Sequence, residues 1–184
     1  MATLIIEDTL FNHAVDDNLC TTLALYRADY GHAVIVYSLD GLVFSHTIGL
    51  AFDFGIELFM INWHTFQDNV TILNKAVEQM RFMSEQEDLS VQDLPFAFFP
   101  VELNNEEPFS CAILGPPCDT GLITPYHQPV ITIMSDLFGS VVPAPIKWHQ
   151  VVWPDSHFCL PHVDENVASS TATLQDPNIV SSVF

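Results

Sequence analysis

Residues 32–44, HAVIVYSLDGLVF, decide the fold of this chain. Residues 32–39 are rich in Val, Ile and Tyr, which favour extended backbone. Asp40-Gly41 then supplies a pair that readily adopts positive φ, as a two-residue hairpin turn requires. Residues 42–44 begin the returning strand. The sequence therefore predicts an antiparallel β-hairpin, around which we expect a central sheet.

Apolar residues at helical spacing predict one helix before the hairpin and one after it. The first begins at Asp16 and Asp17 and ends at Gly31, and its apolar face holds Leu19, Leu23, Tyr26 and Tyr30. The second runs from Thr65 to about Phe82, with Thr65 and Asp68 resembling an N-terminal capping box. Its apolar face holds Phe66, Val70, Leu73, Val77 and Met80. Glu78 and Arg81 are expected to face outward.

The remaining apolar stretches predict further strands. These cover residues 57–61, 95–101, 130–134 and 146–153. Asn105 is expected to cap a short helix, and residues 115–129 to form an irregular loop. The predicted fold class is α+β, a mostly antiparallel central sheet with the long helix packed across one face. We expect one α+β domain over residues 1–163, and a polar C-terminal tail over residues 164–184 that docks on the domain or on a partner.

Charge limits the partners that this chain can have. Its 184 residues include 23 Asp and Glu but only four Lys and Arg, a formal net charge of −19. Four scattered cations cannot form the basic patch that nucleic-acid phosphates require, so direct nucleic-acid binding is not expected. A protein partner, in particular a basic one, fits this charge, and a homo-oligomer also stays open. A nucleic-acid-mimicking inhibitor is a further alternative, although the carboxylates are interspersed with Phe and Leu.

The N-terminal residues indicate a soluble protein, and the cysteines indicate a reducing compartment. Residues 1–6 reach Glu7 and Asp8 before a signal-peptide core could form, and residues 48–61 are interrupted by Asp53 and Glu57, so no membrane span is expected. The four cysteines are irregularly spaced, and we expect free thiols. They are Cys20, Cys111, Cys118 and Cys159.

Three motifs resemble a bacterial and phage family catalogued as domain of unknown function 4262. They are the run from Tyr30-Gly31-His32 to His46-Thr47-Ile48-Gly49-Leu50, then Glu57-Leu58, and finally Gln150-Val151-Val152-Trp153-Pro154-Asp155. The resemblance covers roughly residues 25 to 163. His46 stands where the family usually has Tyr, and His162 where it usually has Trp. The resemblance implies a fold more than an activity, and it implies a protein of the bacterial cytosol, present there in some cases during phage infection.

Two of these motifs contain candidate catalytic residues. If they meet in space, His46, Thr47, Asp155 and His157 could transfer protons or hold an anion. A second interpretation is structural: Thr47 and Asp155 hydrogen-bond backbone groups at strand ends, with Trp153 packed under them, because buried polar groups need partners. The structural interpretation is favoured. The sequence contains no phosphate-binding loop, nucleophile elbow or H-E-x-x-H motif.

A metal site is a weaker candidate. His157, Cys159 and His162 offer three donors within six residues, and Cys118 or His127 could supply a fourth. Their spacing matches no known zinc motif, so we expect neither a metal nor a cofactor. Cys118, between Pro117 and Asp119, is the thiol that we most expect to be exposed, but it has no cation near it in sequence and Asp119 opposes its activation as a nucleophile.

These observations favour a non-enzymatic, acidic protein-interaction module or effector, encoded by a bacterium or a phage. The alternative is a small enzyme or ligand-binding domain that uses a His/Thr/Asp pocket. Residues 96–99, FAFF, could form an exposed binding patch, but bulky aromatics between two prolines are more typical of a core strand.

Overall fold

The computed structural model describes residues 3–7, 17–39, 41–62, 65–86, 96–103, 107–115, 127–139, 141 and 146–178, which form an α+β fold. The described strands are β1 (Thr3–Glu7), β2 (Ala33–Leu39), β3 (Leu42–Ile48), β4 (Ile56–Ile61), β5 (Phe96–Val101), β6 (Phe109–Leu114) and β7 (Lys147–Val152). The described helices are α1 (Asp17–Tyr30), α2 (Ala51–Phe54), α3 (Phe66–Ser84), α4 (His127–Phe138) and α5 (Ser169–Leu174). None of these helices has the length and apolar composition needed to cross a membrane.

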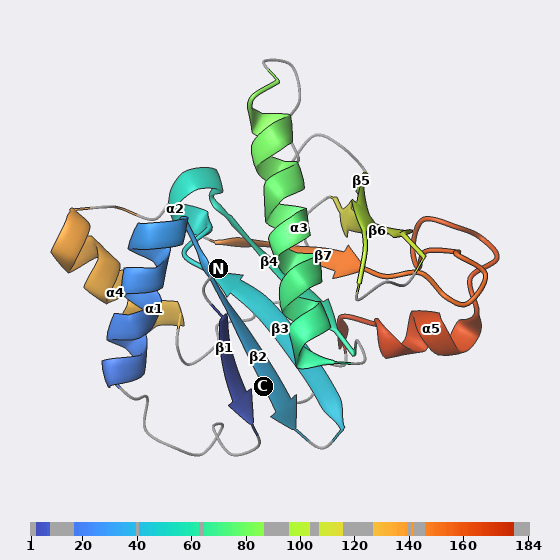
Figure 1. Cartoon of the computed structure of the whole chain (residues 1–184), viewed down its shortest axis with the longest axis horizontal. Coiled ribbons are helices and arrows are strands. Elements are labelled where there is room, and N and C mark those ends of the chain that lie inside the picture. Colours follow the sequence, from blue (N-terminus) through green and yellow to red (C-terminus); the bar gives the residue numbers. More distant parts are fainter. Residues whose placement is uncertain are drawn as a thin grey trace.

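The seven described strands form one mixed sheet in the order β1-β2-β3-β4-β7-β6-β5 (Figure 1). Only the pairs β1–β2 and β4–β7 are parallel, so the predicted mostly antiparallel sheet is confirmed. The hairpin is β2–β3, in which Leu39 pairs with Leu42 across a two-residue turn. Gly41 has a φ of 84° there, a conformation that a side chain would strain. Asp40 lies outside the described residues.

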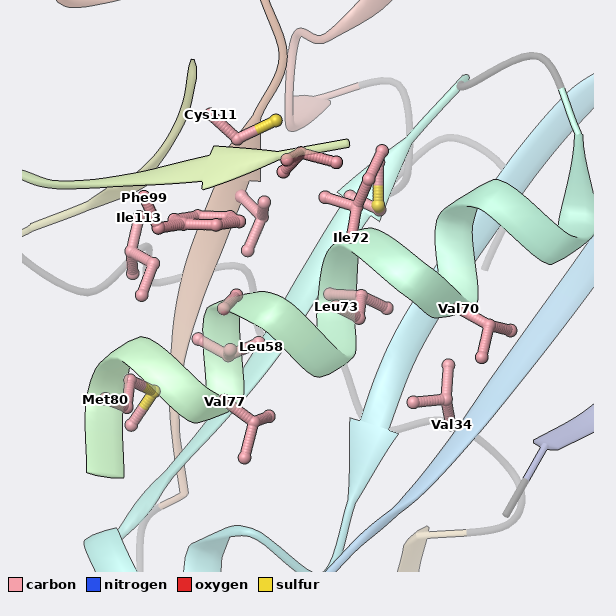
Figure 2. Packing of buried hydrophobic residues seen from close by; sticks show 14 of the residues in the cluster. Val34, Leu58, Val70, Ile72, Leu73, Val77, Met80, Phe99, Cys111 and Ile113 are labelled. Carbon is pink, nitrogen blue, oxygen red and sulfur yellow. The ribbon is translucent and has the colours of Figure 1, made fainter. Parts of the chain in front are cut away.

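Helix α3 packs across one face of the sheet, as predicted. The Thr65 hydroxyl accepts a hydrogen bond from the Asp68 N–H at 3.1 Å and so caps the helix. The predicted apolar face of α3 is buried against β2, β4, β5 and β6 (Figure 2). Its buried members are Val70, Leu73, Val77 and Met80. Each such side chain contributes roughly 1.5–3 kcal/mol by leaving water, so this face supplies much of the driving force for folding.

The opposite face of the sheet is covered by α1 and α4. Leu23 of α1 and Val130 of α4 lie in a second apolar cluster with Phe59 of β4 and Trp148 of β7. Because both faces are covered, all six residues of β4 are buried. The sheet is therefore the middle layer of three, and β4 lies at its centre.

The prediction of a strand over residues 130–134 is wrong, because these residues belong to α4. Val130 and Met134 are four residues apart and both buried, which is the spacing of one helical face. The β-branched content of this stretch suggested a strand, but packing against α1 and the sheet outweighs that local preference. Strands β1 and β6 were not predicted. Asn105 lies outside the described residues, but the short helix predicted after it is wrong where the structure describes the chain, because residues 107 and 108 are not helical and 109–114 form β6. The irregular loop predicted over residues 115–129 is also too long, since α4 begins at His127.

The described part of the predicted tail lies on the domain through Gln175. The backbone N–H of Trp153 donates to Gln175 Oε1 at 2.9 Å, and Gln175 Nε2 donates back to the Trp153 carbonyl at 2.8 Å. The fully buried Gln175 amide thus pairs with the chain just beyond β7 as a neighbouring strand would. The Gln150 side chain donates in turn to the Gln175 carbonyl. The apolar residues on which the tail prediction rested lie outside the described residues: Ile179, Val180, Val183 and Phe184.

Candidate functional site

Thr47 is buried near the end of β3, beside the β3–β4 turn, here residues 49–55, which include α2. Its hydroxyl donates to Glu57 Oε2 at 2.6 Å and accepts from the Leu58 N–H at 2.9 Å. The other oxygen of Glu57, Oε1, accepts from the backbone N–H groups of Gly49 at 2.8 Å and Ala51 at 3.1 Å. Glu57 has no solvent exposure, and it accepts three hydrogen bonds, as a buried carboxylate requires. Thr47 therefore helps to hold this turn together.

His46 is buried beside it and faces the layer formed by α1 and α4. Its ring N–H at Nδ1 donates to the Thr47 carbonyl at 2.7 Å. The imidazole packs edge-on against Trp148, with ring centroids 5.6 Å apart. His46 has no solvent exposure, so a substrate could not reach it without unfolding this part of the core.

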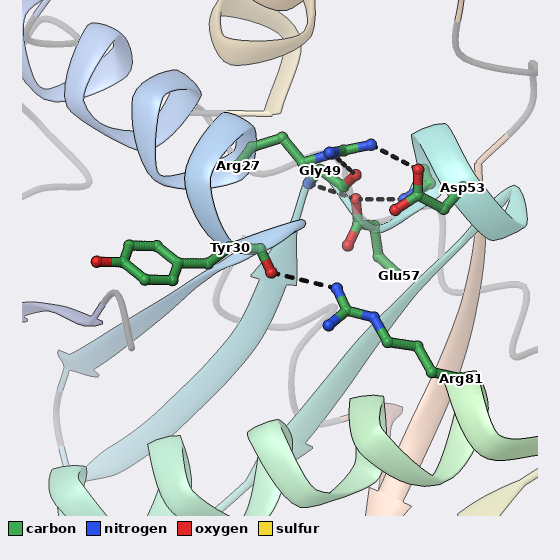
Figure 3. Close-up of polar contacts among 7 residues, drawn as sticks. Arg27, Tyr30, Gly49, Asp53, Glu57 and Arg81 are labelled. Carbon is green, nitrogen blue, oxygen red and sulfur yellow. Dashed lines mark hydrogen bonds and ion pairs between the residues drawn. The ribbon is translucent and has the colours of Figure 1, made fainter.

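Both arginines of the chain converge on the same region (Figure 3). Arg27 donates to the Gly49 carbonyl at 2.8 Å and pairs with Asp53 at 2.6 Å. Gly49 has a φ of 92°, and a Cβ there would lie 2.7 Å from the Arg27 Cδ atom. Arg81 was predicted to face outward, but it bends toward the end of α1 and donates to the Tyr30 carbonyl at 3.2 Å. The arginines thus fasten α1 to the β3–β4 turn and to α3.

Asp155 lies at the opposite edge of the sheet from Thr47. Strand β7 is parallel to β4, and β4 is antiparallel to β3, so β3 and β7 end at opposite edges. The hydrogen bonds agree: Thr47 contacts Leu58 near the start of β4, whereas the Trp153 indole N–H donates to the carbonyl of Ile61 at its end. The structure therefore does not bring the His46-Thr47 motif together with Asp155 and His157, and it forms no composite site from them.

The Asp155 carboxylate instead organises its own loop. Oδ1 accepts from the backbone N–H groups of His157 at 2.8 Å and Cys159 at 3.0 Å, and Oδ2 accepts from Ala168 at 2.8 Å. These bonds, with Ala168 first and then Cys159 and His157, hold the pKa of Asp155 below its usual range. The structural role that the sequence suggested for Asp155 is thus the geometry observed.

Residues 155–164, here called the Asp155 loop, expose an aromatic side chain to solvent. Phe158 is 64% exposed, although its φ is 62°, a conformation that costs a residue with a bulky side chain about 1–3 kcal/mol. Its N–H donates to the Asp155 carbonyl at 3.0 Å. Asp164 closes the far side of the loop, since its carboxylate accepts from the Leu160 N–H at 2.6 Å. A strained conformation of this kind persists only where the surrounding hydrogen bonds fix the backbone conformation.

The three weak metal candidates lie in this loop but do not form a metal site. Among the described residues, no three His, Cys, Asp or Glu side chains are grouped so that they could hold a metal ion. Burial first, and then the charges of Asp155 and Asp164, raise the pKa of the Cys159 thiol, which disfavours the thiolate that zinc requires. Cys118 and the side chain of His127 lie outside what the structure describes.

Comparisons with models of known protein families, with curated proteins and with solved structures find no match to this chain. The resemblance to domain of unknown function 4262 therefore stays a prediction.

The sequence analysis assigned no functional role to three residues that matter here. Glu57 was detectable, because it is the single charged residue in the apolar strand β4. Gln175 and Phe158 gave no local signal. The role of Gln175 depends on where β7 ends. The positive φ of Phe158 depends on its own hydrogen bond to the Asp155 carbonyl and on those that His157 and Cys159 donate to the Asp155 carboxylate.

Two further histidines are buried and kept neutral. His32 donates from Nε2 to the Asn74 side-chain oxygen at 2.8 Å, and His149 donates from Nδ1 to the Leu114 carbonyl at 2.7 Å. Burial is the largest influence on both, and it lowers the pKa of each ring. The native state therefore resists protonation at these positions, whereas the unfolded chain takes up protons near pH 6.5.

The contribution of these two histidines to the free energy of unfolding is therefore fully present above about pH 6.5, and it decreases as the pH falls below that value. The lowered pKa of Asp155 makes a separate contribution to the free energy of unfolding. This contribution is present above about pH 4 and is lost as the pH falls below it. We predict that His149→Asn, which keeps a donor near Leu114 but removes the titration, flattens the pH dependence between pH 7.5 and 5.5. Urea denaturation across this range measures it, with the exposed His162→Asn as control. Equal slopes in all three proteins would contradict the prediction.

Phe158→Gly should raise the free energy of unfolding by about 1 kcal/mol, because the strain removed exceeds the roughly 0.5–1 kcal/mol of entropy that a glycine costs. Phe158→Ala keeps the strain and removes only an exposed ring, so we expect a change within about 0.5 kcal/mol. Chemical denaturation of both variants provides the comparison. A destabilisation by Phe158→Gly of the size seen for core truncations would show that the ring belongs to the core.

Proposed function

We propose that this protein is a non-enzymatic protein-interaction module that binds its partner through the Asp155 loop. The observation that carries the proposal is Phe158: an aromatic side chain that is 64% exposed, on a strained backbone held by hydrogen bonds. Large aromatics that are rigid before binding make effective interface anchors, because little conformational entropy is lost when they are buried. Rigid loops on a stable scaffold are also where binding residues concentrate.

The alternative of an enzyme has less support. The four candidate catalytic residues divide between two edges of the sheet, and His46 and Thr47 have no solvent exposure. Asp155 accepts three backbone hydrogen bonds, which lowers its pKa and suits it to stabilising a loop rather than accepting a proton near neutral pH.

The proposal predicts that Phe158→Ala weakens partner binding by about 10- to 30-fold, the effect of losing a central aromatic anchor. The test is affinity capture by the tagged full chain from an extract of cells that express it, with captured proteins quantified by mass spectrometry. Leu137→Ala is the matched control, because Leu137 is 58% exposed but lies on α4. A protein retained by the wild type and by Leu137→Ala, but depleted with Phe158→Ala, supports the proposal. Equal capture by all three proteins would refute it.

A further inference from the structure

The part of the chain that contains Phe158 carries carboxylates but no Lys or Arg. Residues 148–178 contain no Lys or Arg, and their carboxylates are Asp155, Asp164, Glu165 and Asp176. Lys147 stands at the start of β7, at the other edge of the sheet. The remaining cations lie away from the loop, since Arg27 and Arg81 hold α1, and Lys75 pairs with Glu78 on α3. The Asp155 loop therefore carries carboxylates without a Lys or Arg nearby, and its basic groups are the imidazoles of His157 and His162.

Two of these carboxylates act on residues close to Phe158 in the chain. Asp164 accepts a hydrogen bond from the backbone of Leu160, two residues from Phe158. The charges of Asp155 and Asp164 both act on Cys159, the residue that follows Phe158, where they add to burial in raising the pKa of the thiol. An incoming group thus meets an aromatic face and a negative potential at the same place.

A second copy of the chain does not suit this surface. It would bring the same carboxylates and a further charge of −19, and such like charges oppose association. A basic group makes two favourable interactions here. An Arg or Lys side chain can stack on the face of Phe158, and its charge is attracted to the nearby carboxylates.

We propose that the Asp155 loop docks a Lys- or Arg-rich segment of another protein, with a cationic side chain of that segment over the Phe158 ring and others opposite Asp164 and Glu165. This inference rests on the proposed function and specifies the chemistry of its partner. Arginine fits best, since its planar guanidinium stacks on aromatic rings and pairs with carboxylates.

The test replaces Phe158 in the full chain with the photoreactive residue p-benzoylphenylalanine, and Leu137 likewise as a control. After illumination in cell extract, the cross-linked peptides are sequenced. The expected result is a cross-link specific to position 158, to a peptide enriched in Lys and Arg, with a yield that falls several-fold between 50 and 300 mM salt.

Charge reversal separates a local effect from the overall field. Glu165→Lys should reduce the yield at position 158 several-fold, whereas Glu85→Lys, an equal charge change at an exposed residue at the end of α3, should leave it nearly unchanged. No cross-link above the Leu137 control would refute the proposed function itself. A specific cross-link to a peptide without clustered cations, or equal losses from both reversals, would refute only the basic partner.

Discussion

A polar group buried in a protein must find a hydrogen-bond partner, and this constraint determines what the main polar side chains of the structure do. Glu57 closes the β3–β4 turn by accepting from Thr47, Gly49 and Ala51. Gln175 pairs with the backbone of Trp153 where β7 ends, and Asp155 accepts three backbone N–H groups just beyond it. These side chains fix the places where strands become loops.

The parts of the fold that depend on local signals could be predicted from the sequence. The β2–β3 hairpin and α3 each contain their own turn, cap and periodicity within a short stretch. The parts that depend on distant packing could not. Residues 130–134 form a helix because α1 and the sheet cover their apolar face, and β6 is a strand because β5 and β7 lie on either side of it.

The candidate site shows the same division. That Thr47 and Asp155 would satisfy backbone groups at strand ends followed from their chemistry. Whether they meet depends on the direction of β7, which runs parallel to β4 and so ends at the edge away from Thr47. Strand order and direction are properties of the whole sheet, and they cannot be predicted from a motif of six residues. Phe158 was missed for a related reason, because its exposure and its positive φ follow from the bonds that Asp155 and Asp164 make with the surrounding backbone.

The central claim is that the Asp155 carboxylate holds the loop that exposes Phe158. Amide hydrogen exchange in the wild type and in Asp155→Ala tests it most directly, because the carboxylate binds three identified N–H groups. The account predicts that the amides of His157, Cys159 and Ala168 are protected in the wild type and exchange about 10- to 100-fold faster in the variant, as the loss of hydrogen bonds to a charged group implies. Protection within β7 should be unchanged. Equal exchange of these three amides in both proteins would show that the loop keeps its shape without the carboxylate, and would contradict the account.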